Sequence, residues 1–267
     1  MPRGVDPYDH AKLQGHLWTP AIERPDAWWV VAPGSVQTAS GAVSQLNDLT
    51  GNGRHMTQGT AGSRFTYSDT GGPRGQAIMT GTGKSMSASV ASSTFTAGLT
   101  LISVWRKIGS ATAFNAAPLT RGFGNKPGPV DYYDASRYGG NGTAAFDATT
   151  TADNLGTSSL FTVFNILSQV VTASPFVLNE YVNGVLRKNY TFSATYGDAG
   201  SAIYLATRAD GGTTANMDFI EGYVFQSITT AGRQRVEGYL SWKHWPSGQR
   251  PLGGAHPFRD RPPLIGD

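Results

Sequence analysis

Apolar residues occur in short runs along this chain, and turn-forming residues separate the runs. This pattern is typical of β-strands joined by tight turns. Residues 28–31 form a strong apolar run, which predicts a buried strand. Residues 99–105 are almost continuously apolar, which predicts a strand that is buried on both faces. Less continuous runs predict further strands at residues 43–49, 160–171, 202–206 and 219–228.

One hairpin can be placed by its turn residues. Asn183 and Gly184 lie between two runs in which apolar and polar residues alternate. The Asn-Gly pair favours a type I′ turn, because both central residues of that turn need a positive φ angle. A tight hairpin is therefore predicted at these two residues.

The last periodic segment predicts one short helix, at about residues 230–244. Thr229 or Thr230 can cap its first turn, because a threonine hydroxyl accepts a hydrogen bond from a free backbone N–H there. Its apolar face includes Val236 and Leu240. This helix is expected to close the domain by packing on the sheet.

The pattern divides the chain into three parts. Residues 1–24 form an N-terminal arm that could dock to a partner, residues 25–245 form the domain with its closing helix, and the proline-rich residues 246–267 form a tail packed on the surface. Predicted strands greatly outnumber helices. The predicted fold is therefore all-β, a jelly-roll sandwich of two antiparallel sheets with one short C-terminal helix.

Composition narrows the function classes. The net charge is +3 and the basic residues are scattered, whereas a nucleic-acid binder concentrates them in a stripe. The absence of cysteine excludes disulfides, thiolate zinc sites and cysteine nucleophiles. No run approaches the ~20 apolar residues that span a bilayer, so no membrane insertion is expected. The first residues also lack the apolar core of a secretory signal peptide, which predicts synthesis in the cytoplasm without one.

Several segments resemble one family. They are Leu-Trp-Thr-Pro at 17–20, Val-Ser-Gln at 43–45, Asp-Leu-Thr-Gly-Asn-Gly at 48–53, and Arg-Val-Glu-Gly-Tyr-Leu-Ser-Trp-Lys at 235–243. Together they resemble the concanavalin A-like lectin/glucanase (laminin-G-like) domains of bacteria and bacteriophages. The resemblance implies the jelly-roll fold and points to carbohydrate binding or surface attachment, often in phage virion appendages.

Three functions follow from this resemblance as hypotheses. The preferred one is a phage tail or head fibre or decoration subunit, located on the virion surface, whose lectin-like domain binds host cell-surface polysaccharide. The arm would contact other virion proteins, and a homo-oligomer is expected. The first alternative is a purely structural oligomeric virion subunit that binds no sugar, and the second is a glycosidase on the same fold.

The glycosidase hypothesis depends on the segment Asn-Met-Asp-Phe-Ile-Glu at 216–221. Retaining glycosidases of this fold carry Glu-x-Asp-x-x-Glu, in which one glutamate is the nucleophile and the other the acid/base. Here Asn216 occupies the nucleophile position and cannot form a glycosyl ester. We therefore expect no enzyme, no catalytic residues, and a Glu221 that is paired with a nearby base.

Sugar binding is predicted in a loop that combines tyrosine rings with planar polar groups, because both kinds of group contact sugars. Its residues are Asp131, Tyr132, Tyr133, Asp134, Arg137, Tyr138 and Asn141. The alternative is that these tyrosines cap the core or fill a subunit interface.

Calcium is the one metal for which candidate ligands occur. Asp210, Asn216 and Asp218 offer oxygen ligands near a Gly-Gly turn, as a Ca²⁺ ion requires. Asp-Gly-Gly is also ordinary turn chemistry, so a turn without metal is the alternative. No other cofactor is expected.

Overall fold

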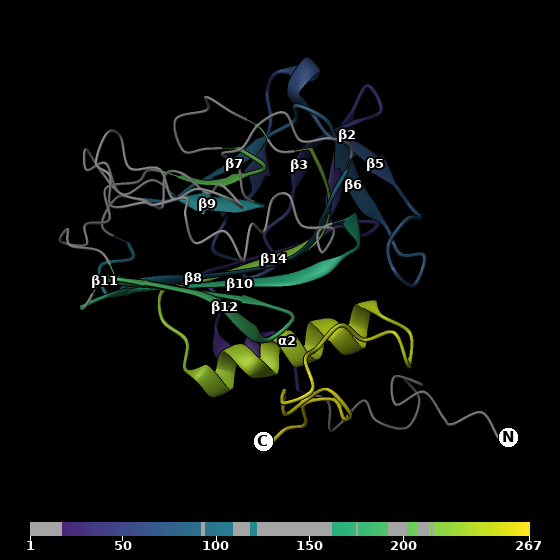
Figure 1. The fold of residues 1–267 in the computed structure, drawn as a ribbon. Helices are drawn as coiled ribbons and strands as arrows, with labels where there is room; N and C mark the ends of the chain where they lie inside the picture. The colour runs from purple at the N-terminus through teal and green to yellow at the C-terminus, as the bar shows by residue number, and fades with distance from the viewer. Residues whose placement is uncertain are drawn as a thin grey trace, which may run out of the picture.

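The computed structural model of the protein describes residues 18–91, 94–108, 118–121, 162–174, 176–191, 202–207, 214 and 216–267. Antiparallel strands dominate this part of the chain, together with one α-helix and two short 3-10 turns, η1 (Pro20–Glu23) and η2 (Ala61–Ser63). The strands form two stacked layers, and the helix packs outside one of them (Figure 1). This arrangement confirms the predicted all-β sandwich with one short C-terminal helix.

Hydrogen bonds connect most of the strands in one path that folds over into the two layers, and two strands branch from it, one pairing with β14 and the other with β3. The helix-side layer contains β12 (Val185–Thr191), β11 (Phe176–Val182), β10 (Asn165–Ala173), β8 (Gly98–Lys107), β14 (Met217–Phe225) and β1 (Ala27–Val30). The opposite layer contains β9 (Leu119–Arg121), β13 (Ala202–Leu205), β7 (Met86–Ser89), β4 (Met56–Thr57), β3 (Ala42–Leu46) and β2 (Val36–Ala39). The path crosses between the layers through β5 (Thr66–Ser68) and β6 (Ile78–Gly81).

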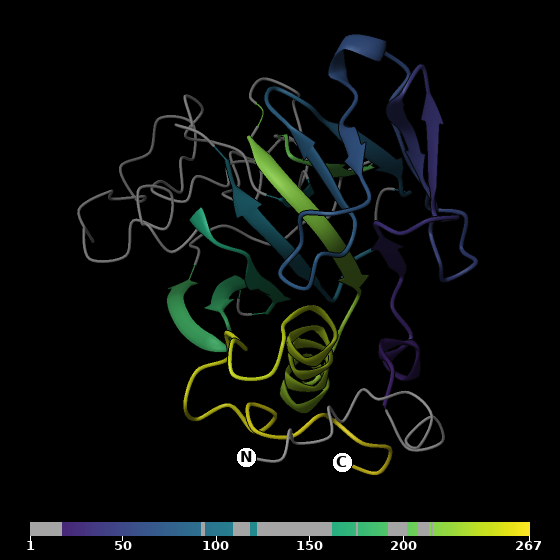
Figure 2. The ribbon, with the colours of Figure 1, turned by 90° about the vertical axis from the view of Figure 1, so that its right-hand side faces the viewer.

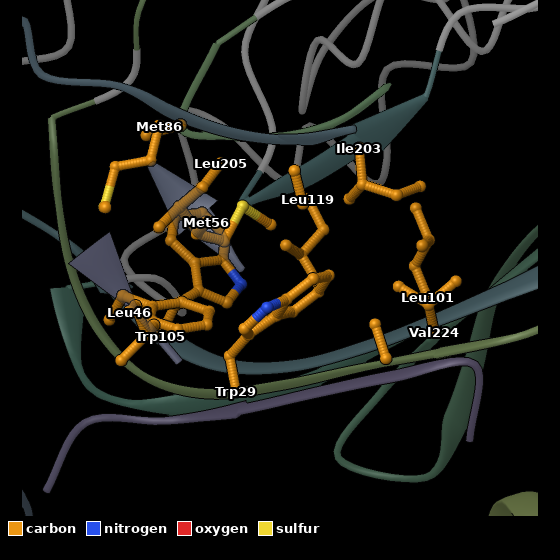
Figure 3. Close-up of a cluster of buried hydrophobic side chains, with 14 of the residues drawn as sticks. Trp29, Leu46, Met56, Met86, Leu101, Trp105, Leu119, Ile203, Leu205 and Val224 are labelled. Atoms are coloured by element: carbon orange, nitrogen blue, oxygen red, sulfur yellow. The ribbon is translucent and has the colours of Figure 1, made fainter. Parts of the chain in front are cut away.

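The main hydrophobic core lies between the two layers. Trp29 of β1 and Trp105 of β8 extend into it from the helix-side layer, and Met86 and Leu205 meet them from the opposite layer (Figure 3). The indole Nε1 of Trp29 donates to the carbonyl oxygen of Arg54 at 2.7 Å, so this buried polar atom is satisfied. Burial of such large aromatic surfaces supplies most of the stabilisation of a sandwich.

Two local predictions are confirmed in the helix-side layer. Strand β8 lies between β10 and β14, and its first eight residues are buried, as its continuous apolar run predicted. Asn183 and Gly184 connect β11 to β12 with φ angles of 54° and 76°, the positive values of the predicted hairpin.

A second hydrophobic cluster joins this layer to the helix α2 (Thr230–His244). The helix starts as predicted, because the hydroxyl oxygen of Thr229 accepts a hydrogen bond from Gly232 N at 3.0 Å. The C-terminal tail then folds under the helix, which Figure 2 shows along its axis. Where the tail passes, the indole Nε1 of Trp242 donates to the carbonyl oxygen of Phe258.

The end of the predicted arm also belongs to this packing. Trp18 is buried, and its backbone N–H donates to the carbonyl oxygen of Pro263 at 3.3 Å. Its ring packs against the ring of Tyr239 on α2 in a T-shaped arrangement. Residues 1–17 lie outside the described residues, so the docking function of the arm stays a prediction. Among the described residues, no helix has the length and hydropathy of a membrane span.

Candidate functional site

Strand β14 carries two carboxylates on its helix side, Asp218 and Glu221. Strict alternation along a strand would place residues three apart on opposite faces. The pairing of β14 with β8 shifts register between Phe219 and Glu221, which is a β-bulge at Ile220. The bulge adds one residue and so turns Glu221 to the same side as Asp218.

Glu221 is fully buried between the sheet and α2. Its Oε1 accepts hydrogen bonds from the Trp28 indole, at 2.8 Å, and from the Tyr223 hydroxyl. Its Oε2 accepts from Lys243 Nζ at 2.7 Å and lies 2.6 Å from His244 Nε2. The prediction that Glu221 pairs with a nearby base is confirmed, and two bases on α2 share it.

The protonation states in this cluster follow from burial and charge. Burial raises the pKa of Glu221, but the charge of Lys243 and the hydrogen bond of His244 outweigh it and lower the pKa to about 2. Burial lowers the pKa of His244 despite its contact with Glu221, so the imidazole is neutral at pH 7. Gln76 Nε2 donates to its Nδ1 at 2.9 Å, which leaves the ring proton on Nε2, facing the carboxylate.

A second buried carboxylate, Glu237 of α2, joins the helix to β10 and to the tail. Its Oε1 accepts from Ser168 Oγ at 2.6 Å and from Arg233, and its Oε2 lies 3.1 Å from His256 Nε2. Arg233 also lies over the ring of Tyr181, 3.6 Å from its centre. Both buried carboxylates therefore fasten α2 to its neighbours.

These contacts decide the structural role of segment 216–221. Asn216 Oδ1 accepts a hydrogen bond from Gly83 N at 3.1 Å, and Asp218 pairs with Arg106. Glu221 is covered by the helix and held ionised, whereas a general acid must reach the leaving-group oxygen and carry a proton. The segment is part of the scaffold beneath α2.

An open cleft of about 460 Å³ lies beside this scaffold, where the chain leaves α2. Its volume falls within the roughly 300–1,000 Å³ of small-molecule sites. Its lining combines apolar surface with planar polar groups. The lining residues are Gly71, Gly72, Pro73, Arg106, Val163, Phe164, Asn165, Asn183, Trp245, Gln249 and Pro251.

Arg106, near the end of β8, gives the cleft its charge. Its Nε donates to Asp218 Oδ2 at 2.6 Å, and its guanidinium lies over Phe164, 4.7 Å from the ring centre. The side chain of Asp218 is 3% exposed and that of Arg106 is 35% exposed, so the carboxylate lies behind the guanidinium and the guanidinium reaches solvent. Within the described residues, the two terminal nitrogens of Arg106 form no hydrogen bond.

The amides beside Arg106 are held by the hairpin and by β10. Asn183 Nδ2 donates to Asn165 Oδ1 at 2.7 Å, and Asn183 Oδ1 accepts from Ile166 N at 3.0 Å. Their positions are therefore fixed by the positive-φ turn of the hairpin. Gln249 differs, because its side chain is exposed and forms no hydrogen bond within the described part of the chain.

A second depression, of about 380 Å³, lies between η1 and the turn that follows β3. Most of its polar groups are used internally: Asp26 pairs with Arg54 and accepts from Gln226 N, and Asn52 Nδ2 donates to Asp26 O. The exposed Arg24 has no side-chain partner within the described residues. This depression is the weaker candidate, because it offers fewer polar groups that are both held in place and available to a ligand.

The sites predicted from sequence fall mostly elsewhere. The tyrosine loop, residues 131–141, lies outside the described residues, and so does Asp210. The structure places Asn216 and Asp218 against Gly83 and Arg106 respectively, so both side chains have partners other than a metal. No group of three His, Asp or Glu within the described residues is arranged to hold a metal ion. The tyrosine loop and a calcium site that includes Asp210 stay predictions.

Sequence reasoning missed the cleft. Its residues come from the loop between β5 and β6, from β8, from the chain that leads into β10, from the β11–β12 hairpin and from the chain after α2. These segments are far apart in the sequence. No motif marks Arg106. Two sequence features lie in this region, the hairpin residue Asn183 and the carboxylate Asp218, and neither indicated a cleft.

No protein-family model matches the chain, and no curated protein matches it. Solved structures with a similar fold include an arabinofuranosidase complexed with arabinofuranosyl-α-1,2-xylobiose, with a TM-score of 0.50 and 13% identity over 73% of this chain and 50% of that one. The Trypanosoma rangeli sialidase matches with a TM-score of 0.49 and 11% identity, over 77% of this chain and 31% of that one. The botulinum neurotoxin serotype D ligand binding domain was solved with N-acetylneuraminic acid. It matches with a TM-score of 0.49 and 8% identity, over 82% of this chain and 52% of that one.

The chain thus spans 31% to 52% of the length of these three proteins. At such low identity the likeness extends to the fold alone. The protein has a β-sandwich fold similar to that of the arabinofuranosidase.

Proposed function

We propose that the protein is a non-catalytic glycan-binding module and that the cleft beside Arg106 holds a sugar residue. The observation that carries this proposal is that the cleft combines apolar surface with planar polar groups whose positions are held by β10 and the hairpin. Apolar contacts from Val163 and Pro251 can cover the C–H surface of a sugar. The fixed amide of Asn183 and the exposed amide of Gln249 can bind its hydroxyl groups.

The non-catalytic part of the proposal rests on Glu221. It is the acid/base candidate of the one glycosidase-like segment, and the helix covers it. Asp218, the other carboxylate of that segment, is occupied by Arg106. Glycoside hydrolysis needs two carboxyl groups on either side of an accessible bond, and this segment supplies none.

The setting of the module is a finer proposal that rests on the sequence resemblance. We place it in a phage virion appendage, on the particle surface, with host cell-surface polysaccharide as its ligand. A homo-oligomer agrees with the exposure of Val185 and Leu186, 39% and 49%, on β12. This strand ends the hydrogen-bonded path of the described strands, so its edge can pair with another copy.

Binding of the purified protein to a panel of bacterial capsular polysaccharides and lipopolysaccharides tests the function. Saturable binding, competed by the free polysaccharide and without release of reducing ends, is the expected result. Release of reducing ends would replace the proposal with a glycosidase. A stable oligomer that binds no glycan would favour the purely structural subunit.

The place of the site is tested by filling the cleft. Val163 is 60% exposed at its rim, so Val163→Trp should narrow the cleft and weaken glycan binding at least about tenfold while the fold persists. Ile22→Trp is the matched control, because Ile22 is 52% exposed on η1, away from the cleft. Equal affinity of both variants, measured by isothermal titration calorimetry, would show that the sugar binds elsewhere.

A further inference from the structure

We infer that the cleft selects sugars that carry a carboxylate, and that Arg106 is the residue that binds this group. The inference rests on the proposed function and names its ligand class: an acidic sugar of the uronic or sialic type. Three features of Arg106 support it, namely hydrogen-bond donors that have no partner among the described residues, a fixed orientation and the electrostatic surroundings.

The free donors come from the shape of the guanidinium. An arginine side chain has five N–H donors in a planar fork, and Asp218 uses only the one on Nε. The four N–H donors on the two terminal nitrogens have no partner among the described residues. Two parallel N–H groups of such a fork match the two oxygens of one carboxylate, which gives two charge-assisted hydrogen bonds.

The orientation of this fork is fixed from two sides. The ion pair with the buried Asp218 holds the Nε edge, and Phe164 supports one face of the guanidinium at 4.7 Å. An arginine that is already held in place loses little side-chain freedom when its ligand binds. Asp218 is therefore a positioning residue, and Arg106 is the residue that contacts the ligand.

The electrostatic surroundings favour one carboxylate over a polyanion. Arg106 is the only charged residue among those described that line the cleft. A ligand carboxylate thus meets no opposing carboxylate among the described lining residues. Asp218 offsets the charge of Arg106 from behind, so the pair adds little long-range attraction and selects by hydrogen-bond geometry. A sulfated or phosphorylated polymer needs a dense basic patch, and the described lining of this cleft contains one basic residue.

The first experiment compares acidic polysaccharides with their carboxyl-reduced forms. Capsular polysaccharides that contain uronic or sialic acid are tested beside the same polymers after carbodiimide and borohydride reduction, which converts each carboxylate to a neutral alcohol. The expected result is binding of the native polymers and at least about tenfold weaker binding of the reduced ones. Free glucuronate, and not glucose, should compete with the native polymers.

The outcomes separate this inference from the proposed function. Equal binding of native and reduced polymers, or binding of neutral polysaccharides alone, would overturn the carboxylate inference and leave the glycan-binding function standing. Binding of no polysaccharide at all, acidic or neutral, would overturn both.

The second experiment assigns the carboxylate to Arg106. Arg106→Lys keeps a positive charge beside Asp218 but removes the planar fork. We expect affinity for the native acidic polymer to fall about tenfold and affinity for the reduced polymer to stay unchanged. Arg24→Lys is the matched control, because Arg24 is an exposed arginine without a side-chain partner in the described structure and lies outside the cleft.

Thermal unfolding of both variants checks that each is folded. Unchanged affinity of folded Arg106→Lys for the native polymer would overturn the assignment of Arg106. If this variant does not fold, competition of the wild-type protein by free glucuronate decides whether a carboxylate is recognised.

Discussion

Asp218 and Glu221 are two carboxylates on the same side of the same strand, yet one lies beside an open cleft and the other is sealed. Glu221 lies beneath α2 and accepts hydrogen bonds from Lys243 and His244 of this helix. Asp218 lies toward the cleft, where Trp245 and the chain after the helix line the walls. Its partner Arg106 is 35% exposed, whereas His244 is 4% exposed.

The difference shows how one helix separates scaffold from candidate site. A buried carboxylate that is saturated by partners on a neighbouring element fixes that element in place, but it has nothing left to offer a ligand. A carboxylate that binds one edge of an arginine leaves the other edge free. The same residue type therefore stabilises at one position and orients a binding group at the other.

The largest effect is expected from a substitution in the buried cluster that Glu221 forms with Lys243 and His244. Glu221→Gln removes the charge that Lys243 and the neighbouring donors share, and we expect the free energy of unfolding to fall by about 4 kcal/mol. Glycan affinity of the folded protein should stay unchanged. Urea unfolding measures the first quantity and calorimetry the second.

Glu23→Gln is the control for this prediction, because Glu23 pairs with Arg235 at 2.7 Å in a less buried setting, with side chains 16% and 22% exposed. It should cost about 1 kcal/mol. Similar losses in the two variants would contradict the special role of the sealed cluster.

The next effect is a loss of stability in acid. The pKa of Glu221 is about 2 in the folded protein and 4.5 as its ordinary value, so the unfolded chain binds a proton first as the pH falls. The contribution of Glu221 to the free energy of unfolding is complete above pH 4.5 and is lost as the pH falls through 2. The change is about 3 kcal/mol. His244 acts in the same direction below its ordinary pKa of 6.5, because burial lowers its folded pKa.

Urea unfolding between pH 2 and pH 7 measures this dependence. Other carboxylates also titrate in this range, so the comparison with Glu221→Gln isolates one group. The variant should lose less stability between pH 4.5 and pH 2 than the wild-type protein does. Parallel curves for the two proteins would mean that folding does not lower the pKa of Glu221.

The smallest expected effect concerns Asp218. Asp218→Asn removes an ion pair with a partly exposed arginine, so the unfolding free energy should fall by only about 1 kcal/mol. The same unfolding measurement checks it. A loss as large as that of Glu221→Gln would show that both carboxylates stabilise the fold equally. It would contradict the difference in role inferred for them.

Much of the fold was predictable because its signals are local. The apolar run of β8, the Asn183–Gly184 turn and the cap of α2 each depend on a few consecutive residues. The pairing of Glu221 with a base was also predictable, because a buried carboxylate requires one. Which bases supply it depends on how α2 packs.

The candidate site was not predictable, because it depends on long-range placement. Whether Arg106 meets Asp218 depends on the register between β8 and β14, and the bulge at Ile220 alters that register. A sequence read by strict alternation places Glu221 on the wrong face. Phe164 and Trp245 reach the cleft from segments that no local pattern connects.

The contact between Trp18 and Pro263 has a practical consequence for engineering. Trp18, the first described residue, and Pro263, four residues before the last one, lie at neighbouring points beneath α2 and are joined by a backbone hydrogen bond. A domain whose ends meet can be inserted into a surface turn of another protein without stretching either chain. Residues 18–263 can therefore be displayed as a loop insertion, with the helix side toward the host protein and the opposite layer of the sandwich facing outward.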